Sequence, residues 1–273
     1  MSGRVTVEKR GPSAILRFLN DDSGYMDDGT EVALGEAIDS VEADDSVRAV
    51  ILTGGRLGVF IEHFDLCVLE ARGRALAARG KTFNADRPVP ETPLHLAFRR
   101  IEESGKPYLC AINGTAMGGG FELALCCDLR IAEDGPYEIG LPEINAGLLP
   151  GAGGTQNLPR LIGLGRALEL LLLGKTVSPR EAEALCLVHR CVSGSALSCA
   201  LEIAGQLAAK PPRAIAHIKR LARAAQILPR DAGMSLERTL FCDLLVSPES
   251  IERMAALNAG KGDLRRGVMI EKE

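Results

Sequence analysis

Short apolar runs alternate with longer amphipathic segments through much of this chain, and this alternation constrains its fold more than any other feature. Short apolar runs are typical of buried strands, whereas apolar residues spaced three and four apart are typical of helices. A helical pattern covers residues 30–41, and another follows Asp65, whose carboxylate can cap the first turn. The pattern therefore predicts an α/β fold in which helices join the strands. The strand-like runs are residues 5–7, 14–18, 49–53, 108–112, 129–132 and 187–192.

After about residue 158 the pattern changes to nearly continuous helix. Before that point, Pro88, Pro90 and Pro93 make residues 81–93 an irregular surface excursion or lid, because proline interrupts helices. We expect a core domain over residues 1–195 and a helical C-terminal part of the same fold over residues 196–273. The helical segments are residues 161–173, 179–185, 196–208, 212–228, 235–245 and 248–259.

Composition and charge argue against several classes of protein. The chain has 32 basic and 36 acidic residues, no basic block and no Trp, so we expect no nucleic-acid partner. Its most apolar run, around residues 168–173, is far shorter than the ~20 residues of a membrane-spanning helix, so we expect no membrane partner. The N-terminus lacks the apolar segment of a signal peptide, which favours a cytoplasmic location.

The eight cysteines lie among aliphatic neighbours, and we interpret them as reduced packing residues. Cys186, His189 and Cys191 form the one group that resembles zinc ligands. A structural zinc site needs a second ligand pair at similar spacing, and the next cysteine, Cys199, falls in an apolar helical pattern. We therefore expect no metal ion.

A glycine-rich junction links the strand-like run at residues 108–112 to a helical segment that begins near Phe121. Gly118, Gly119 and Gly120 lack side chains, so the backbone there can approach a ligand closely and present free amides at a helix N-terminus. Such amides favour an anion or a developing oxyanion. A tight packing turn would explain the same glycines, and both interpretations stay open.

A second glycine cluster covers residues 150–156. It lacks the Lys that ends a Walker loop and the spacing of a dinucleotide-binding motif. We interpret it as a turn that starts a helix.

Two acidic residues complete the pattern. Glu122 follows the three glycines, and Glu143 follows Pro142 at what looks like another helix N-terminus. Each alone is most simply a first-turn glutamate that complements the helix dipole. Together, two carboxylates near one reacting carbon can share acid and base work on a single water.

These segments resemble the crotonase superfamily, whose best-known members are the enoyl-CoA hydratases. Residues 46–55 are similar to the family's third strand. Residues 113–128 match its motif N-G-x-x-x-G-G-G-x-E-L-A-x-x-C-D, and residues 142–160 match P-E-I-x-x-G-x-x-P-G-x-G-G-T-Q-x-L-P-R. The resemblance implies a spiral of ββα units followed by helices that assemble a homotrimer or a homohexamer. It also implies acyl-CoA thioester substrates.

The resemblance carries specific roles onto residues of this chain. It implies that the amides of Phe64 and Gly119 form an oxyanion hole for the thioester oxygen, and that Glu122 and Glu143 are the catalytic acids. His63 stands beside the oxyanion residue where the family has a small residue, and we expect it to line the substrate channel. The expected substrate-binding residues are His63, Gly118, Gly120, Pro142 and Gly151.

Retention of both glutamates favours an enoyl-CoA hydratase, a hydro-lyase of fatty acid metabolism that adds water across the α,β double bond of an acyl-CoA thioester. Another reaction of the family, catalysed by an isomerase, hydrolase or lyase, is the first alternative. A catalytically silent, oligomeric acyl-CoA-binding protein is the second. No cofactor is expected, because the thioester itself is the electron sink.

Overall fold

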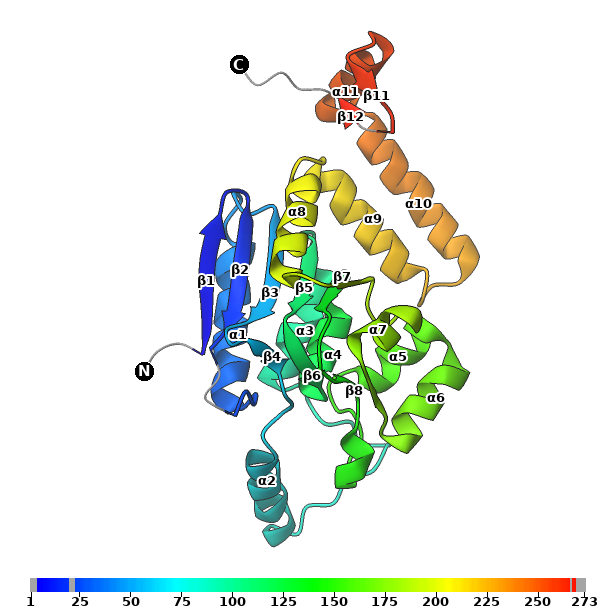
Figure 1. The fold of residues 1–273 in the computed structure, drawn as a ribbon. Helices are drawn as coiled ribbons and strands as arrows, with labels where there is room; N and C mark the ends of the chain where they lie inside the picture. Colours follow the sequence, from blue (N-terminus) through cyan, green and yellow to red (C-terminus); the bar gives the residue numbers. More distant parts are fainter. Residues whose placement is uncertain (1–3, 20–22, 266, 269–273) are drawn as a thin grey trace. The chain divides into compact units, whose positions relative to one another are not determined.

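The computed structural model describes residues 4–19, 23–265 and 267–268. The chain divides into two compact units, Met1–Ala209 and Lys210–Glu273 (Figure 1). The first unit contains both of the larger sheets, and the second is mainly helical.

A six-stranded sheet forms the centre of the first unit, in the order β1-β2-β3-β5-β7-β10. β1 and β2 form an antiparallel hairpin, and every other neighbouring pair is parallel. The six predicted strands all lie in this sheet, although the last is a strand only from Arg190, because Leu187 and Val188 bond to Ala182 at the end of a helix. The strands are β1 (Val5–Arg10), β2 (Ser13–Phe18), β3 (Ala49–Gly54), β5 (Tyr108–Ile112), β7 (Leu129–Glu133) and β10 (Arg190–Val192).

A second sheet of four short strands has the order β4-β6-β8-β9. Three times along the chain, a strand of the larger sheet leads into one of this sheet and then into a helix, which confirms the expected spiral of ββα units. Glycines allow neighbouring strands of this sheet to approach closely, since a Cβ on Gly114 of β6 would lie 1.9 Å from the backbone of Gly58 of β4. The strands are β4 (Gly58–Ile61), β6 (Gly114–Met117), β8 (Ile139–Gly140) and β9 (Thr176–Val177).

Helices pack on both faces of the six-stranded sheet. Leu16 and Leu52 belong to a core shared with α1 (Asp28–Glu42), α3 (Pro93–Glu103) and α4 (Gly119–Cys126). The alternate side chains, Ile15 and Ile51, pack against α8 (Ala196–Ala208) instead. α8 is therefore part of the first compact unit, whereas we expected a boundary before residue 196.

The remaining helices of the first unit follow strands of the second sheet along the chain. Asp65 caps α2 as expected, because its carboxylate accepts from the amide of Cys67 at 2.7 Å. The predicted helix over residues 161–173 is two helices, which meet at Gly163 with φ of 83°. Residues 81–92 are irregular, but Pro93 starts α3, since proline suits the first position of a helix. The helices are α2 (Leu66–Ala78), the 3₁₀ helix η1 (Glu143–Ala146), α5 (Gly154–Ile162), α6 (Leu164–Leu173) and α7 (Pro179–Ala184).

The second unit consists of three helices and a two-stranded hairpin. Ile218, Phe241 and Val246 are among its apolar side chains that remain exposed in the single chain. Among the described residues of the whole chain, no helix combines the length and the apolar character needed to cross a membrane. The elements are α9 (Pro212–Ala224), α10 (Arg230–Leu245), α11 (Pro248–Asn258), β11 (Gly262–Asp263) and β12 (Gly267–Val268).

Candidate active site

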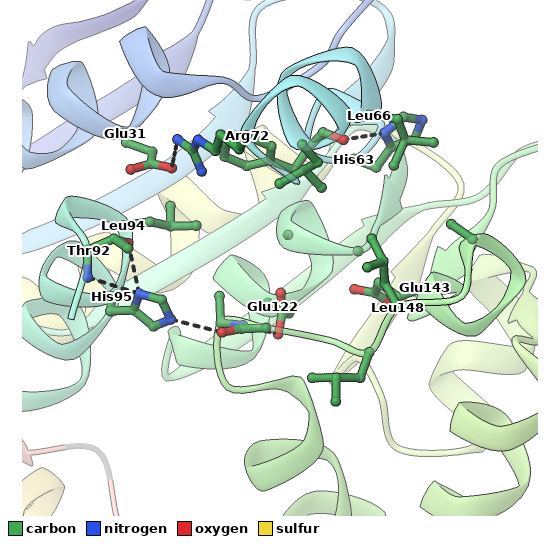
Figure 2. Close-up of a pocket in the computed structure, with 18 of the residues that line it drawn as sticks. Glu31, His63, Leu66, Arg72, Thr92, Leu94, His95, Glu122, Glu143 and Leu148 are labelled. Atoms are coloured by element: carbon green, nitrogen blue, oxygen red, sulfur yellow. Dashed lines mark hydrogen bonds and ion pairs between the residues drawn. The ribbon is translucent and has the colours of Figure 1, made fainter. Parts of the chain in front are cut away.

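A cavity of about 360 Å³ lies in the first unit, between the N-terminus of α4, the start of α3, and α2 (Figure 2). Three glutamates and two histidines line it, and most of the other lining side chains are apolar. Its lining includes Glu31, His63, Phe64, Leu66, Leu69, Arg72, Thr92, Leu94, His95, Gly118, Gly119, Glu122, Pro142, Glu143, Ala146, Leu148, Leu149, Gly151 and Ala152.

Glu122 is buried in the first turns of α4 and is only 3% exposed. Its Oε1 accepts hydrogen bonds from the amides of Ala152 at 2.7 Å and Gly154 at 2.8 Å. Burial raises the pKa of Glu122, while the two amides and the nearby His95 act in the opposite direction. The carboxylate is thus fixed in one orientation by backbone donors.

The second glycine cluster supplies those donors. A Cβ on Gly154 would lie 2.7 Å from Leu141 and 3.1 Å from Oε1 of Glu122, so a larger residue would push the loop away from the carboxylate. Gly153 takes φ of 111°, which favours glycine. The predicted turn that starts a helix is confirmed, because α5 begins at Gly154. The contact of this turn with Glu122 was not predicted.

Glu143 is the first residue of η1 and faces the cavity. In Figure 2, Glu122 lies between His95 and Glu143. Neither of its carboxyl oxygens has a hydrogen-bond partner among the described residues, although both are buried. Burial raises the pKa of Glu143 to about 7, and the charge of Glu122 contributes in the same direction. Glu143 therefore holds a proton much more readily than an exposed glutamate does.

The predicted oxyanion residues, Phe64 and Gly119, lie next to one another. A Cβ on Gly119 would be 3.9 Å from the Cβ of Phe64. Met26 bonds to the residues on either side of Phe64, donating to the carbonyl of His63 at 2.9 Å and accepting from the amide of Asp65 at 2.8 Å. Within the part of the chain that the structure describes, neither the Phe64 nor the Gly119 amide is recorded as a donor. Two such amides can hold one developing oxyanion.

Side-chain contacts hold both Phe64 and the adjacent His63. The guanidinium of Arg72 lies 5.2 Å from the centre of the Phe64 ring, and it also pairs with Asp28 and with Glu31. His63 stacks on Tyr25 with ring centres 4.3 Å apart. These contacts hold large side chains where the sequence motif of the family has small ones.

Most of the residues predicted for the site line this one cavity. Of the five expected to bind substrate, His63, Gly118, Pro142 and Gly151 are lining residues. Gly120 is not among them, because it faces β4, where a Cβ would lie 2.4 Å from the carbonyl oxygen of Ile61. Its lack of a side chain serves helix packing.

Sequence reasoning missed His95, Arg72 and the apolar lining residues. From the sequence alone His95 has no assignable chemical role, since nothing in its own helical pattern distinguishes it. Pro93 indicates the start of a helix, and His95 is the third residue of that helix. This position near a helix N-terminus is the one signal in the sequence for His95.

The ββα spiral and this cavity, which is lined by Glu122, Glu143, Phe64 and Gly119, define a crotonase-type protein. The chain belongs to the enoyl-CoA hydratase/isomerase family, whose sequence profile matches residues 26–258.

Comparison with known proteins agrees with this assignment. The fatty acid oxidation complex subunit alpha of Shewanella frigidimarina (strain NCIMB 400) is 36% identical over a 187-residue alignment, and the match covers 65% of this chain and 24% of that protein. The chain thus spans about a quarter of the length of the curated relatives it matches.

Solved structures match over nearly the whole chain. DspI of Pseudomonas aeruginosa is 32% identical with a TM-score of 0.84, covering 99% of this chain and 97% of that one. The enoyl-CoA hydratase of Bacillus anthracis is 27% identical with a TM-score of 0.83, covering 99% and 100%. An enoyl-CoA hydratase from Polaromonas sp. JS666 is 29% identical with a TM-score of 0.83, covering 98% and 99%.

Proposed function

We propose that this protein is an enoyl-CoA hydratase, which adds water across the α,β double bond of an acyl-CoA thioester. The observation that carries the proposal is the pair formed by Glu122 and Glu143, which face one cavity in different hydrogen-bonding environments. Two carboxyl groups whose environments differ can divide the work of base and acid.

In this mechanism the thioester oxygen accepts hydrogen bonds from the amides of Phe64 and Gly119. Glu122 removes a proton from a water molecule, and the oxygen of that water bonds to the β-carbon. The electron pair of the double bond moves to the α-carbon and the thioester oxygen, where the two amides stabilise the charge. Glu143 then gives its proton to the α-carbon, which completes the hydration.

The electrostatics of the two acids support this division. Burial raises the pKa of Glu122, and the two amides on Oε1 oppose that rise, in the direction that a base requires. The raised pKa of Glu143, about 7, favours its protonated form, as an acid requires.

Substrate class and assembly are part of the proposal. Leu66, Leu69, Leu94, Leu148 and Leu149 give the cavity an apolar lining that suits a fatty acyl group. The similarity to the fatty acid oxidation complex subunit alpha supports a role in fatty acid metabolism. We propose a homotrimer or homohexamer in the cytoplasm that needs no cofactor, since the thioester accepts the electron pair.

The test is turnover of crotonyl-CoA and of longer enoyl-CoA thioesters, followed by loss of the enoyl absorbance and by a mass gain of one water. Hydration of at least one of them supports the proposal. A shifted double bond or released CoA instead of hydration would assign another reaction of the family. Calorimetric binding of these thioesters without any turnover would favour a silent binding protein.

A further inference from the structure

The peptide group between Gly151 and Ala152 is bound at both of its edges. Its N–H donates to Oε1 of Glu122 at 2.7 Å, and its carbonyl oxygen lies 2.8 Å from Nε2 of His95. A trans peptide group is planar, with N–H and C=O pointing in opposite directions, so a single orientation satisfies both contacts. If the group turned over, the carbonyl oxygen would face the carboxylate and both contacts would be lost.

The partners of His95 determine which ring nitrogen carries the proton. Nδ1 lies 3.2 Å from the amide nitrogen of Thr92, which can only donate, so Nδ1 accepts. The neutral ring then carries its proton on Nε2, which donates to the carbonyl of Gly151. His95 therefore joins the N-terminus of α3 to the loop that holds Glu122, and in Figure 2 it lies between Thr92 and Glu122.

The Gly151 side of this peptide group is open, whereas Ala152 on its other side is buried. Gly151 is exposed, and a Cβ there would meet nothing nearer than the carbonyl oxygen of Leu149 at 4.0 Å. A glycine in open space can rotate its adjoining peptide groups at little cost. The hydrogen bond from His95 is thus the contact that opposes rotation on the carbonyl edge.

We propose that His95 is a positioning residue, which locks the Gly151–Ala152 peptide so that Oε1 of Glu122 keeps its backbone donors. A hydrogen bond to the carbonyl also polarises the peptide and strengthens its N–H as a donor, by about 10–30%. Oε2 of Glu122 accepts no recorded hydrogen bond from the described residues and remains available to a substrate water. This inference rests on the proposed function where it assigns Glu122 the role of base.

Two variants test the roles of the two ring nitrogens of His95 separately. His95→Gln places an amide donor where Nε2 lies, and His95→Asn keeps an acceptor for Thr92 but cannot reach Gly151. We expect His95→Asn to lower kcat by about 10- to 100-fold, the range for loss of a hydrogen bond that supports a charged group, with little change in KM. In His95→Gln, kcat should stay within about threefold of the wild-type value, because the side-chain amide still donates a hydrogen bond to the carbonyl of Gly151. Equal kcat for wild type and His95→Asn, at equal melting temperatures, would overturn the proposal, and so would equal losses in the two variants.

A second measurement does not depend on activity. Hydrogen exchange followed by mass spectrometry reports on the amides of residues 151–154, which include the two donors to Glu122. We expect faster exchange there in His95→Asn than in the wild type and in His95→Gln. Identical exchange in all three proteins would refute the role of His95. If the wild type hydrates no enoyl thioester, the proposed function fails, while the exchange data still decide whether His95 positions the loop.

Discussion

Glu122 and Glu143 share one cavity, yet the first accepts two backbone amides within 2.8 Å and the second accepts no hydrogen bond from the described part of the chain. The difference follows from local structure, because the glycine turn at residues 150–154 reaches Glu122, whereas η1 starts at Glu143 with its side chain directed into apolar space. Burial raises the pKa of both acids, and at Glu122 the two oriented donors oppose that rise.

Replacing either glutamate with glutamine keeps its size and removes its capacity for proton transfer. Because a positioned acid or base contributes roughly 10²- to 10⁴-fold, Glu122→Gln and Glu143→Gln should each lower kcat by about that factor. The double variant should be little worse than either, because the two groups act as a unit in one reaction and such effects are not additive. The measurement is enoyl-CoA turnover, with thioester binding checked by calorimetry. Wild-type rates in Glu122→Gln beside an inactive Glu143→Gln would point to a reaction that uses one acid.

The raised pKa of Glu143 makes the free energy of unfolding depend on pH. The folded protein binds the proton more tightly than the unfolded chain does, so this stabilisation is complete below about pH 4.5 and is lost as the pH rises toward about 7. Glu143→Gln is neutral at every pH and avoids this loss. We expect it to be more stable than the wild type at pH 8, with a smaller difference at pH 5. Urea unfolding at both pH values tests this, and a pH-independent difference would contradict it.

The second unit predicts an oligomer. Its exposed apolar residues, among them Ile218, Phe241 and Val246, are costly to leave in water on amphipathic helices. We expect a trimer or hexamer in solution, which light scattering coupled to size-exclusion chromatography would detect. A stable monomer at micromolar concentration would show that these side chains are covered in another way.

The sequence patterns predicted the large sheet better than the small one. Tyr108–Ile112 and Ala49–Gly54 are buried apolar runs, and apolar runs of this length identify strands. β4, β6 and β8 have two to four residues each and contain glycine, so they carry no such signal. Their pairing depends on the close crossing of the chain at positions such as Gly114, which is a tertiary property.

The candidate site likewise contains some residues that the sequence predicts and others that depend on tertiary contacts. Glu122, Glu143 and Gly119 could be predicted because they lie in two long motifs. His95 and Arg72 could not, since their contacts to Gly151 and Phe64 join segments that only the fold brings together. Gly120 lies in the same motif as Gly119, but the motif does not tell which way each residue faces. That direction is set by α4 and by the contact of Gly120 with Ile61.

Gly120 is expected to matter for stability. In Gly120→Ala, the new Cβ would lie 2.4 Å from the carbonyl oxygen of Ile61, so α4 or β4 must move. We expect a loss of roughly 1–3 kcal/mol in the free energy of unfolding, typical of overpacking. Denaturant unfolding measures it. A variant as stable as the wild type would show that the helix shifts without cost.

Gly119 is expected to matter for catalysis. It is the first residue of α4, a position where helices accept proline, so Gly119→Pro removes the amide while leaving the helix intact. Gly119→Ala is the matched control, because it keeps the amide and its Cβ would lie 3.9 Å from both Met26 and Phe64, an ordinary contact distance. Removing one oxyanion donor typically lowers kcat by ~10²- to 10³-fold.

We therefore expect Gly119→Pro to lose turnover by about that factor, while Gly119→Ala stays close to the wild type. Melting temperatures of the two variants separate a missing donor from a damaged fold. The proline ring also places carbon where the amide proton pointed, so binding of the thioester should weaken together with kcat. A folded Gly119→Pro protein that hydrates enoyl-CoA at the wild-type rate would exclude this amide from the oxyanion hole, and Phe64 would then need a different partner donor.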